Sequence, residues 1–222
     1  MVVRFTRKLA ALEPVRFVEQ LACCTPPLRE VLVGRNWRFG RKGSGTPALL
    51  SKMGDAAGLR VTVVDAVQRA GRTVSSTRVR EAVTAGRLGD VARMLGRPFS
   101  VLGTVMHGHG VGRKIGYPTA NLDPHGEALP PFGVYAVRAR MAGGRERWGV
   151  LSIGVRPTFA HGGHPKSSFE LHLPGFRGNL YGQDIEVVFS RFIRGERRFE
   201  SVNALKGEVK RDIAIARRLA RR

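Results

Sequence analysis

The sequence is poor in cysteine and has no long apolar run, and each shortage excludes a class of protein. Two of its 222 residues are cysteine, and Cys23 and Cys24 are adjacent, so they cannot build the disulfide framework of a small secreted domain. No apolar run approaches the roughly 18–20 residues that a membrane span needs. The N-terminal segment also lacks the long apolar core of a signal peptide. We therefore expect a cytoplasmic protein without a membrane partner.

Acidic residues are also scarce relative to basic ones. The chain has 17 Asp and Glu against 38 Lys and Arg, a formal net charge of +21. Such a balance is typical of proteins that bind polyanions. However, the basic residues are spread along the whole chain, and aromatic residues make up 7% of it, so neither a basic arm nor an aromatic stripe marks a nucleic-acid interface. A basic nucleic-acid-binding protein stays open as an alternative, but nucleic acid is not the partner we expect.

Residues 1–97 have the pattern of an α/β segment. Helical spacing over residues 10–24 is followed by a short apolar strand at 30–34, a helix at 46–58 and a second strand at 60–65. Two further helices are expected at 75–87 and from 88 to Gly96. Strands that alternate with helices indicate a parallel α/β unit.

Residues 98–222 have a different rhythm. Short β-rich runs occur at 101–105, 133–140, 147–153, 168–173 and 185–192, and glycine- and proline-containing loops separate them. This is the pattern of a small antiparallel barrel. A helix with an apolar stripe follows from Ser201.

The loop at residues 103–121 is dense in glycine and ends in Pro-Thr-Ala-Asn. Its glycines let the backbone approach a ligand closely, and successive N–H groups can bind an anion. Neither Walker A nor Rossmann spacing occurs in the loop, so the glycines alone leave a phosphate loop and an irregular surface loop both open. In extended chain Thr119 and Asn121 face the same way, and their oxygens suit Mg²⁺ held between ATP phosphates. A proline-initiated turn is the alternative.

Residues 112–121, GRKIGYPTAN, closely resemble the riboflavin kinase family, in which PTAN binds Mg-ATP. The resemblance continues through residues 133–135, 153–159, 169–173, 179–182 and 194–199, and it covers roughly residues 98–222. It implies a six-stranded antiparallel barrel with a C-terminal helix, which uses ATP and Mg²⁺ to phosphorylate riboflavin to FMN. The residues implied as ATP contacts are Gly108, Gly112, Arg113, Lys114, Gly116, Pro118, Thr119 and Asn121, and Thr119 and Asn121 are also the implied metal ligands.

The resemblance places the catalytic base at Glu170. In the alternating run 168–172, Glu170 shares a face with His172 and opposes Phe169 and Leu171. Phosphoryl transfer needs a carboxylate to accept the proton of the acceptor hydroxyl, which agrees with this role. The alternative is a solvated carboxylate on an edge strand.

Residues 33–40 and 74–80 resemble two motifs of the FMN adenylyltransferase domain that precedes the kinase domain in bifunctional bacterial FAD synthetases. Ser76, Thr77 and Arg80 are the implied contacts to ATP phosphates, and a serine-capped helix is the alternative. That domain normally opens with a paired-histidine motif, but the first histidine of this chain is His107. We therefore interpret residues 1–97 as a truncated adenylyltransferase-like segment, either of an incomplete sequence or of a degenerate monofunctional kinase. FMN adenylylation is doubtful because the paired-histidine motif is missing, and a bifunctional enzyme that also makes FAD is kept as the alternative.

Overall fold

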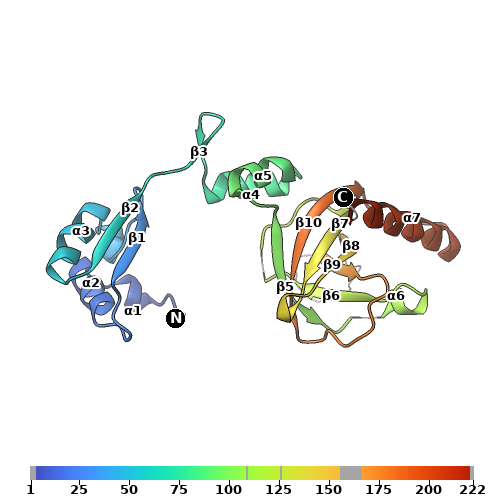
Figure 1. Ribbon diagram of the computed structural model, residues 1–222, viewed down its shortest axis with the longest axis horizontal. Helices are drawn as coiled ribbons and strands as arrows, with labels where there is room; N and C mark the ends of the chain where they lie inside the picture. Colours follow the sequence, from blue (N-terminus) through green and yellow to red (C-terminus); the bar gives the residue numbers. More distant parts are fainter. Residues whose placement is uncertain (1–3, 109, 126, 156–166, 221–222) are drawn as a thin grey trace. The chain divides into compact units, whose positions relative to one another are not determined.

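The computed structural model describes residues 4–108, 110–125, 127–155 and 167–220, and the chain divides into two compact units, Met1–Val74 and Ser75–Arg222 (Figure 1). The helices that follow residue 75 belong to the second unit, although the sequence pattern favoured placing them with the first. A domain boundary after residue 97 stays a prediction.

The first unit contains a two-stranded parallel sheet covered by helices. Both strands lie where the sequence predicted them, and Val33 is opposite Val63. The helix predicted over residues 10–24 is shorter in the structure and spans Pro14–Ala22, because Pro14 occupies its first turn, and a separate short helix ends at Ala10. The elements are α1 (Arg7–Ala10), α2 (Pro14–Ala22), β1 (Glu30–Gly34), η1 (Arg41–Gly43), α3 (Pro47–Ala56), β2 (Arg60–Val64), β3 (Gln68–Arg69) and β4 (Arg72–Thr73).

The core of this unit lies between the sheet and the helices. Val18, Val33, Phe39 and Leu50 are buried there, and the Phe39 ring stacks on Trp37 at 4.8 Å between ring centroids. The third helix begins at Pro47 because the hydroxyl of Thr46 accepts a hydrogen bond from the Leu49 N–H at 3.3 Å.

The second unit is a closed six-stranded barrel with helices outside it. Neighbouring strands are antiparallel in the order β10-β5-β6-β9-β8-β7, which confirms the predicted fold and its C-terminal helix (Figure 1). The sixth strand, β6, is one that the β-rich runs did not indicate. The elements are α4 (Ser76–Thr84), α5 (Leu88–Leu95), β5 (Ser100–Met106), α6 (Val111–Lys114), β6 (Thr119–Asp123), β7 (Gly133–Arg140), η2 (Ala142–Gly144), β8 (Glu146–Val155), β9 (Ser167–His172), β10 (Asp184–Arg194) and α7 (Val202–Ala220).

Alternate residues of each strand fill the barrel. Leu151 and Ile153 are fully buried inside it, and Phe169 and Leu171 are 1% exposed. The outer faces of β7 and β8 are covered by α7, whose Ala216 packs in one apolar cluster with residues of both strands. The barrel therefore has a packed interior, and one part of its outer wall is enclosed by a helix.

We expect Leu151→Ala to destabilise the protein strongly. The change removes a fully buried side chain from the barrel interior and leaves a cavity, which typically costs roughly 3–5 kcal/mol of unfolding free energy. Denaturant unfolding followed by circular dichroism measures the loss. Leu102→Ala is the matched control, because Leu102 is 48% exposed on the same barrel. Equal losses in the two variants would contradict the interior position of Leu151.

Candidate functional site

Glu170 lies on β9, which pairs with β6 on one side and with β8 on the other, so the closed barrel leaves this strand no free edge. It is opposite Asn121 on β6 and Ser152 on β8. The edge-strand alternative for Glu170 is therefore wrong. Residues directly opposite in antiparallel strands project from the same face of the sheet. Glu170 and Asn121 therefore project from the outer face, while the flanking residues of Glu170 fill the interior.

Thr119 completes a polar cluster with Asn121 and Glu170. The Thr119 hydroxyl donates a hydrogen bond to Oε2 of Glu170 at 3.3 Å, and the two residues are 51 positions apart in the sequence. Both Thr119 and Asn121 belong to β6, so the proline-initiated turn proposed as an alternative is wrong. Next to them, Nδ1 of His172 lies 2.8 Å from the carbonyl oxygen of Pro118, which fixes the residue that precedes the strand.

The glycine-rich loop closes over this cluster. A side chain on Gly108 would collide with the amide of Asn121. One on Gly112 would collide with the carbonyl of Tyr117 and the hydroxyl of Thr119. These two glycines are therefore required by the close approach of the loop to its own protein, whatever ligand it binds. Gly116 has φ +91°, a backbone conformation that favours glycine at the end of the loop.

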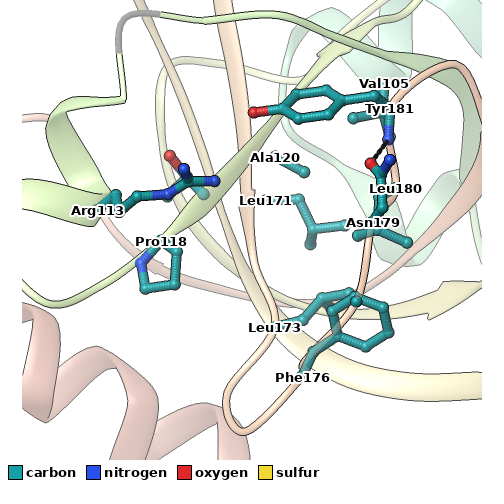
Figure 2. A pocket seen from close by; sticks show the side chains of 12 residues that line it. Val105, Arg113, Pro118, Ala120, Leu171, Leu173, Phe176, Asn179, Leu180 and Tyr181 are labelled. Atoms are coloured by element: carbon teal, nitrogen blue, oxygen red, sulfur yellow. Dashed lines mark hydrogen bonds between the residues drawn. The ribbon is translucent and has the colours of Figure 1, made fainter.

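A cavity of about 300 Å³ opens beside the cluster at the mouth of the barrel (Figure 2). We call it the mouth cavity. Figure 2 shows the rings of Tyr181 and Phe176 on opposite sides of it, with the guanidinium of Arg113 extending toward it from α6. The Tyr181 ring also stacks on His107, at 4.0 Å between ring centroids. The lining is Val105, Arg113, Pro118, Thr119, Ala120, Leu171, Leu173, Phe176, Gly178, Asn179, Leu180 and Tyr181.

A second cavity of about 420 Å³ lies on the outer face, between the barrel, α7 and the segment that joins β10 to α7. We call it the helix-side cavity. Its lining is Gly112, Ile115, Tyr117, Thr119, Val134, Val150, Ser152, Glu170, His172, Arg194, Glu196, Arg197, Phe199, Leu205, Val209 and Asp212. Thr119 lines both cavities, and its hydrogen-bond partner Glu170 lines this one. A ligand in either cavity would therefore reach the Thr119–Glu170 pair.

The donor set at this junction suits a hard cation that is held mainly by phosphates. Within the described parts of the chain, no group of three or more His, Cys, Asp or Glu side chains could hold a metal ion. Mg²⁺ between ATP phosphates needs one or two protein oxygens, and the Thr119 hydroxyl and Asn121 amide supply that type of ligand. Asn121 is 9% exposed.

The remaining sequence-predicted residues are distributed differently. Arg113 and Pro118 line the mouth cavity and Gly112 lines the helix-side cavity, whereas Lys114 is exposed and lines neither. Ser76, Thr77 and Arg80 are exposed residues of α4 and line neither cavity. The hydroxyl that caps α4 is that of Ser75, which accepts a hydrogen bond from the Arg78 N–H at 3.2 Å. Residues 156–159 of the family-like segment 153–159 lie outside the described residues.

Several residues that line the two cavities were not predicted as site residues. Tyr181 and Phe199 lie within segments that carried the family resemblance, but neither ring was predicted to line a binding site. Asp212 had a weaker signal, because it interrupts the apolar stripe of the last helix between Val209 and Ala216.

Comparison with known proteins covers both units. The family model for riboflavin kinase matches residues 95–220, and the model for FAD synthetase matches residues 1–78. The bifunctional riboflavin kinase/FMN adenylyltransferase of Escherichia coli K12 is 38% identical over 215 residues, which are 97% of this chain and 68% of that protein. The protein of the same name from Pseudomonas fluorescens is 38% identical over 217 residues, again 97% of this chain and 68% of the relative.

A solved structure described as a macrolide-efflux protein from Streptococcus pneumoniae resembles the chain with a TM-score of 0.69 and 28% identity, covering 96% of this chain and 67% of that one. Among the residues that the structure describes here, no helix is long and apolar enough to cross a membrane.

Proposed function

The chain belongs to the family of bifunctional riboflavin kinase/FMN adenylyltransferases, and we propose that it transfers the γ-phosphate of ATP to riboflavin, giving FMN and ADP. The observation that carries this proposal is the hydrogen-bonded pair of Thr119 and Glu170 at the junction of two cavities. A kinase must hold two substrates on either side of the reacting atoms and exclude water between them. Two cavities that share one residue beside a carboxylate meet that requirement.

We assign ATP to the mouth cavity and riboflavin to the helix-side cavity. The mouth cavity offers an arginine and two aromatic rings, which suit phosphates and a nucleobase. The helix-side cavity is larger and has the apolar wall that a flavin ring requires, with Val134, Val150 and Leu205 among its residues.

In this arrangement Glu170 accepts the proton of the riboflavin 5′-hydroxyl as the hydroxyl oxygen bonds to the γ-phosphorus of ATP and the bond to the β–γ bridging oxygen breaks. The Thr119 hydroxyl orients the carboxylate through its hydrogen bond. Thr119 and Asn121 would also hold Mg²⁺, which neutralises phosphate charge when it is bound with ATP. The glycine-rich loop packs against the same two residues through Gly108 and Gly112.

The direct test is incubation of the purified chain with ATP, Mg²⁺ and riboflavin, followed by separation of the flavins by chromatography. We expect FMN and ADP to form in equal amounts. A folded protein that binds both substrates but forms no FMN would refute the assignment.

The match of residues 1–78 to FAD synthetase favours FMN adenylyltransferase as a second activity. The comparisons do not confirm the doubt raised by the missing paired histidines, because the named bacterial relatives are described as having both activities. Incubation with FMN and ATP distinguishes the two possibilities. FAD and pyrophosphate would form if the N-terminal unit is active, and FMN would stay unchanged if the chain is a kinase alone.

We expect Tyr181→Ala to raise the KM for ATP about tenfold and to leave the KM for riboflavin nearly unchanged. Tyr181 lines the mouth cavity and not the helix-side cavity, and stacking of a base on an aromatic ring contributes about 1–3 kcal/mol. Initial-rate kinetics with each substrate varied in turn measure both constants. Tyr181→Phe keeps the ring and should behave like the parent. A change in the riboflavin KM alone would reverse the assignment of the cavities.

A further inference from the structure

Asp212 is a buried acid on the face of α7 that packs against the barrel. Among the described residues, it and Asn121 are the two buried side chains that are polar or charged, and the Asp212 side chain is 3% exposed. A carboxylate in such a position costs several kcal/mol of desolvation unless an opposite charge and hydrogen bonds compensate it. Asp212 therefore needs a cationic partner held at hydrogen-bonding distance.

Arg194, the last residue of β10, supplies that compensation. Its Nη2 donates to Oδ2 of Asp212 at 2.8 Å, and its Nε lies 3.1 Å from Oδ1. Both carboxylate oxygens are therefore engaged by one planar guanidinium, the geometry that fixes an arginine in orientation as well as position. The remaining nitrogen, Nη1, donates to the carbonyl of Gly195 at 3.1 Å, so the fixed side chain also holds the backbone that follows it.

Residues 194–199, which we call the strap, are tied to α7 at a second point. Arg197 forms an ion pair with Glu208, which is the other acidic residue of α7. The guanidinium carbons of Arg194 and Arg197 lie 5.6 and 5.1 Å from the centroid of the Phe199 ring. The two acids of α7 thus determine the position of the strap, and through both arginines the position of an aromatic ring.

The strap forms one side of the helix-side cavity. Arg194, Glu196, Arg197 and Phe199 all line that cavity, and none of them lines the mouth cavity. The Glu196 carboxylate packs so closely on Gly154 that a side chain there would collide with it. The strap is therefore held from α7 on one side and seated against the barrel on the other.

Stability alone is a poor explanation for this buried ion pair. Replacement of such pairs by apolar residues of similar volume is often neutral or stabilising, whereas removal of one partner is strongly destabilising. The Arg194–Asp212 pair fixes a cavity-lining side chain, the Gly195 backbone and one contact to the Phe199 ring, so its main effect is on the geometry of the cavity.

We propose that Asp212 is a positioning residue for riboflavin: it holds Arg194, and thereby holds the strap in the conformation that binds the flavin. The proposal rests on the assignment of riboflavin to the helix-side cavity. It predicts that the loss of Asp212 weakens riboflavin binding, while ATP binding in the mouth cavity is retained.

The test uses Asp212→Asn, which keeps the size of the side chain and removes its charge. We expect the Kd for riboflavin, from titration of riboflavin fluorescence, and the KM for riboflavin to rise at least tenfold. The Kd and KM for ATP should stay within about twofold of the parent. Asp90→Asn is the matched control, because the Asp90 side chain is 44% exposed, pairs with Arg87 and Arg93 and lines neither cavity, and the change should alter neither constant.

A double variant, Arg194→Met with Asp212→Leu, separates positioning from folding. It buries no unpaired charge, so we expect a melting temperature close to that of the parent. Riboflavin binding should nevertheless stay at least tenfold weaker, because the start of the strap loses its anchor on Asp212 and the Arg197–Glu208 ion pair alone then ties the strap to α7. This variant decides the question even if Asp212→Asn fails to fold.

Three results would overturn the inference: unchanged riboflavin affinity in Asp212→Asn, an equal loss for ATP and riboflavin, or full riboflavin affinity in the double variant. Binding is measured without turnover, so the proposed kinase activity can fail independently. A parent chain that binds riboflavin in an Asp212-dependent way but forms no FMN would contradict the kinase assignment alone. A parent that binds no riboflavin would contradict both.

Discussion

Replacing Glu170 with glutamine is expected to lower kcat for FMN formation by about 10²–10⁴-fold, the usual contribution of a positioned general base. Glutamine has nearly the same size and can still accept the hydrogen bond from Thr119, but its amide cannot take the proton of the riboflavin hydroxyl. The side chain is only partly buried, so the barrel should tolerate the change. Steady-state FMN formation at saturating substrates measures the effect.

The control for this variant is Glu127→Gln, which makes the same chemical change at an exposed residue that lines neither cavity. It should have the turnover of the parent. Titrations with ATP and with riboflavin should show that Glu170→Gln still binds both, so that the loss lies in the chemical step. Near-normal turnover in Glu170→Gln would remove the glutamate from the mechanism.

Much of the barrel could be predicted from sequence, because alternation of apolar and polar residues over five runs is a direct consequence of having one face in the interior. The strand that this pattern missed is β6, Thr119–Asp123. Its outward positions, Thr119 and Asn121, are part of the polar cluster, and Asn121 is buried. The segment Thr119–Asp123 does alternate polar and apolar residues, but it is five residues long and contains Asn and Asp, which are depleted in strands. The polar residues proposed for the chemistry therefore weakened the strand signal of this segment.

The candidate site was predictable in its parts but not in its assembly. The glycine-rich loop and Glu170 each belonged to a recognisable segment, yet their contact depends on the pairing of β6 with β9 across 51 residues. We expected glycine at residues 108 and 112 to allow the close approach of a ligand. In the structure these two glycines allow the loop to pack on Asn121 and Thr119. Such close approaches between distant segments leave no periodic signal in the sequence.

Asn121→Ala is expected to weaken binding of Mg·ATP by roughly 10–100-fold, the range typical of disturbed metal sites, while riboflavin binding survives. The amide is buried beneath Gly108 and opposite Glu170, so its loss removes a hard oxygen ligand that water can replace only by entering a closed space. Calorimetric titration with Mg·ATP measures the affinity, and titration of riboflavin fluorescence measures the other substrate. Asn203→Ala, at an exposed position of α7, should leave both affinities unchanged.

A second substitution at the same position separates metal binding from packing. Asn121→Asp keeps the size of the side chain and replaces the amide by a carboxylate, which is a better ligand for Mg²⁺ but lies opposite Glu170. If Asn121 binds the cation, the aspartate variant should retain Mg·ATP affinity and lose it when Mg²⁺ is removed, because two carboxylates on one face then repel the phosphates and each other. If Asn121 only supports the loop above it, the alanine and aspartate variants should weaken Mg·ATP binding alike, and the dependence on Mg²⁺ should match that of the parent. The first pattern would assign the amide to the metal, and the second would leave Thr119 as the protein ligand at the junction of the two cavities.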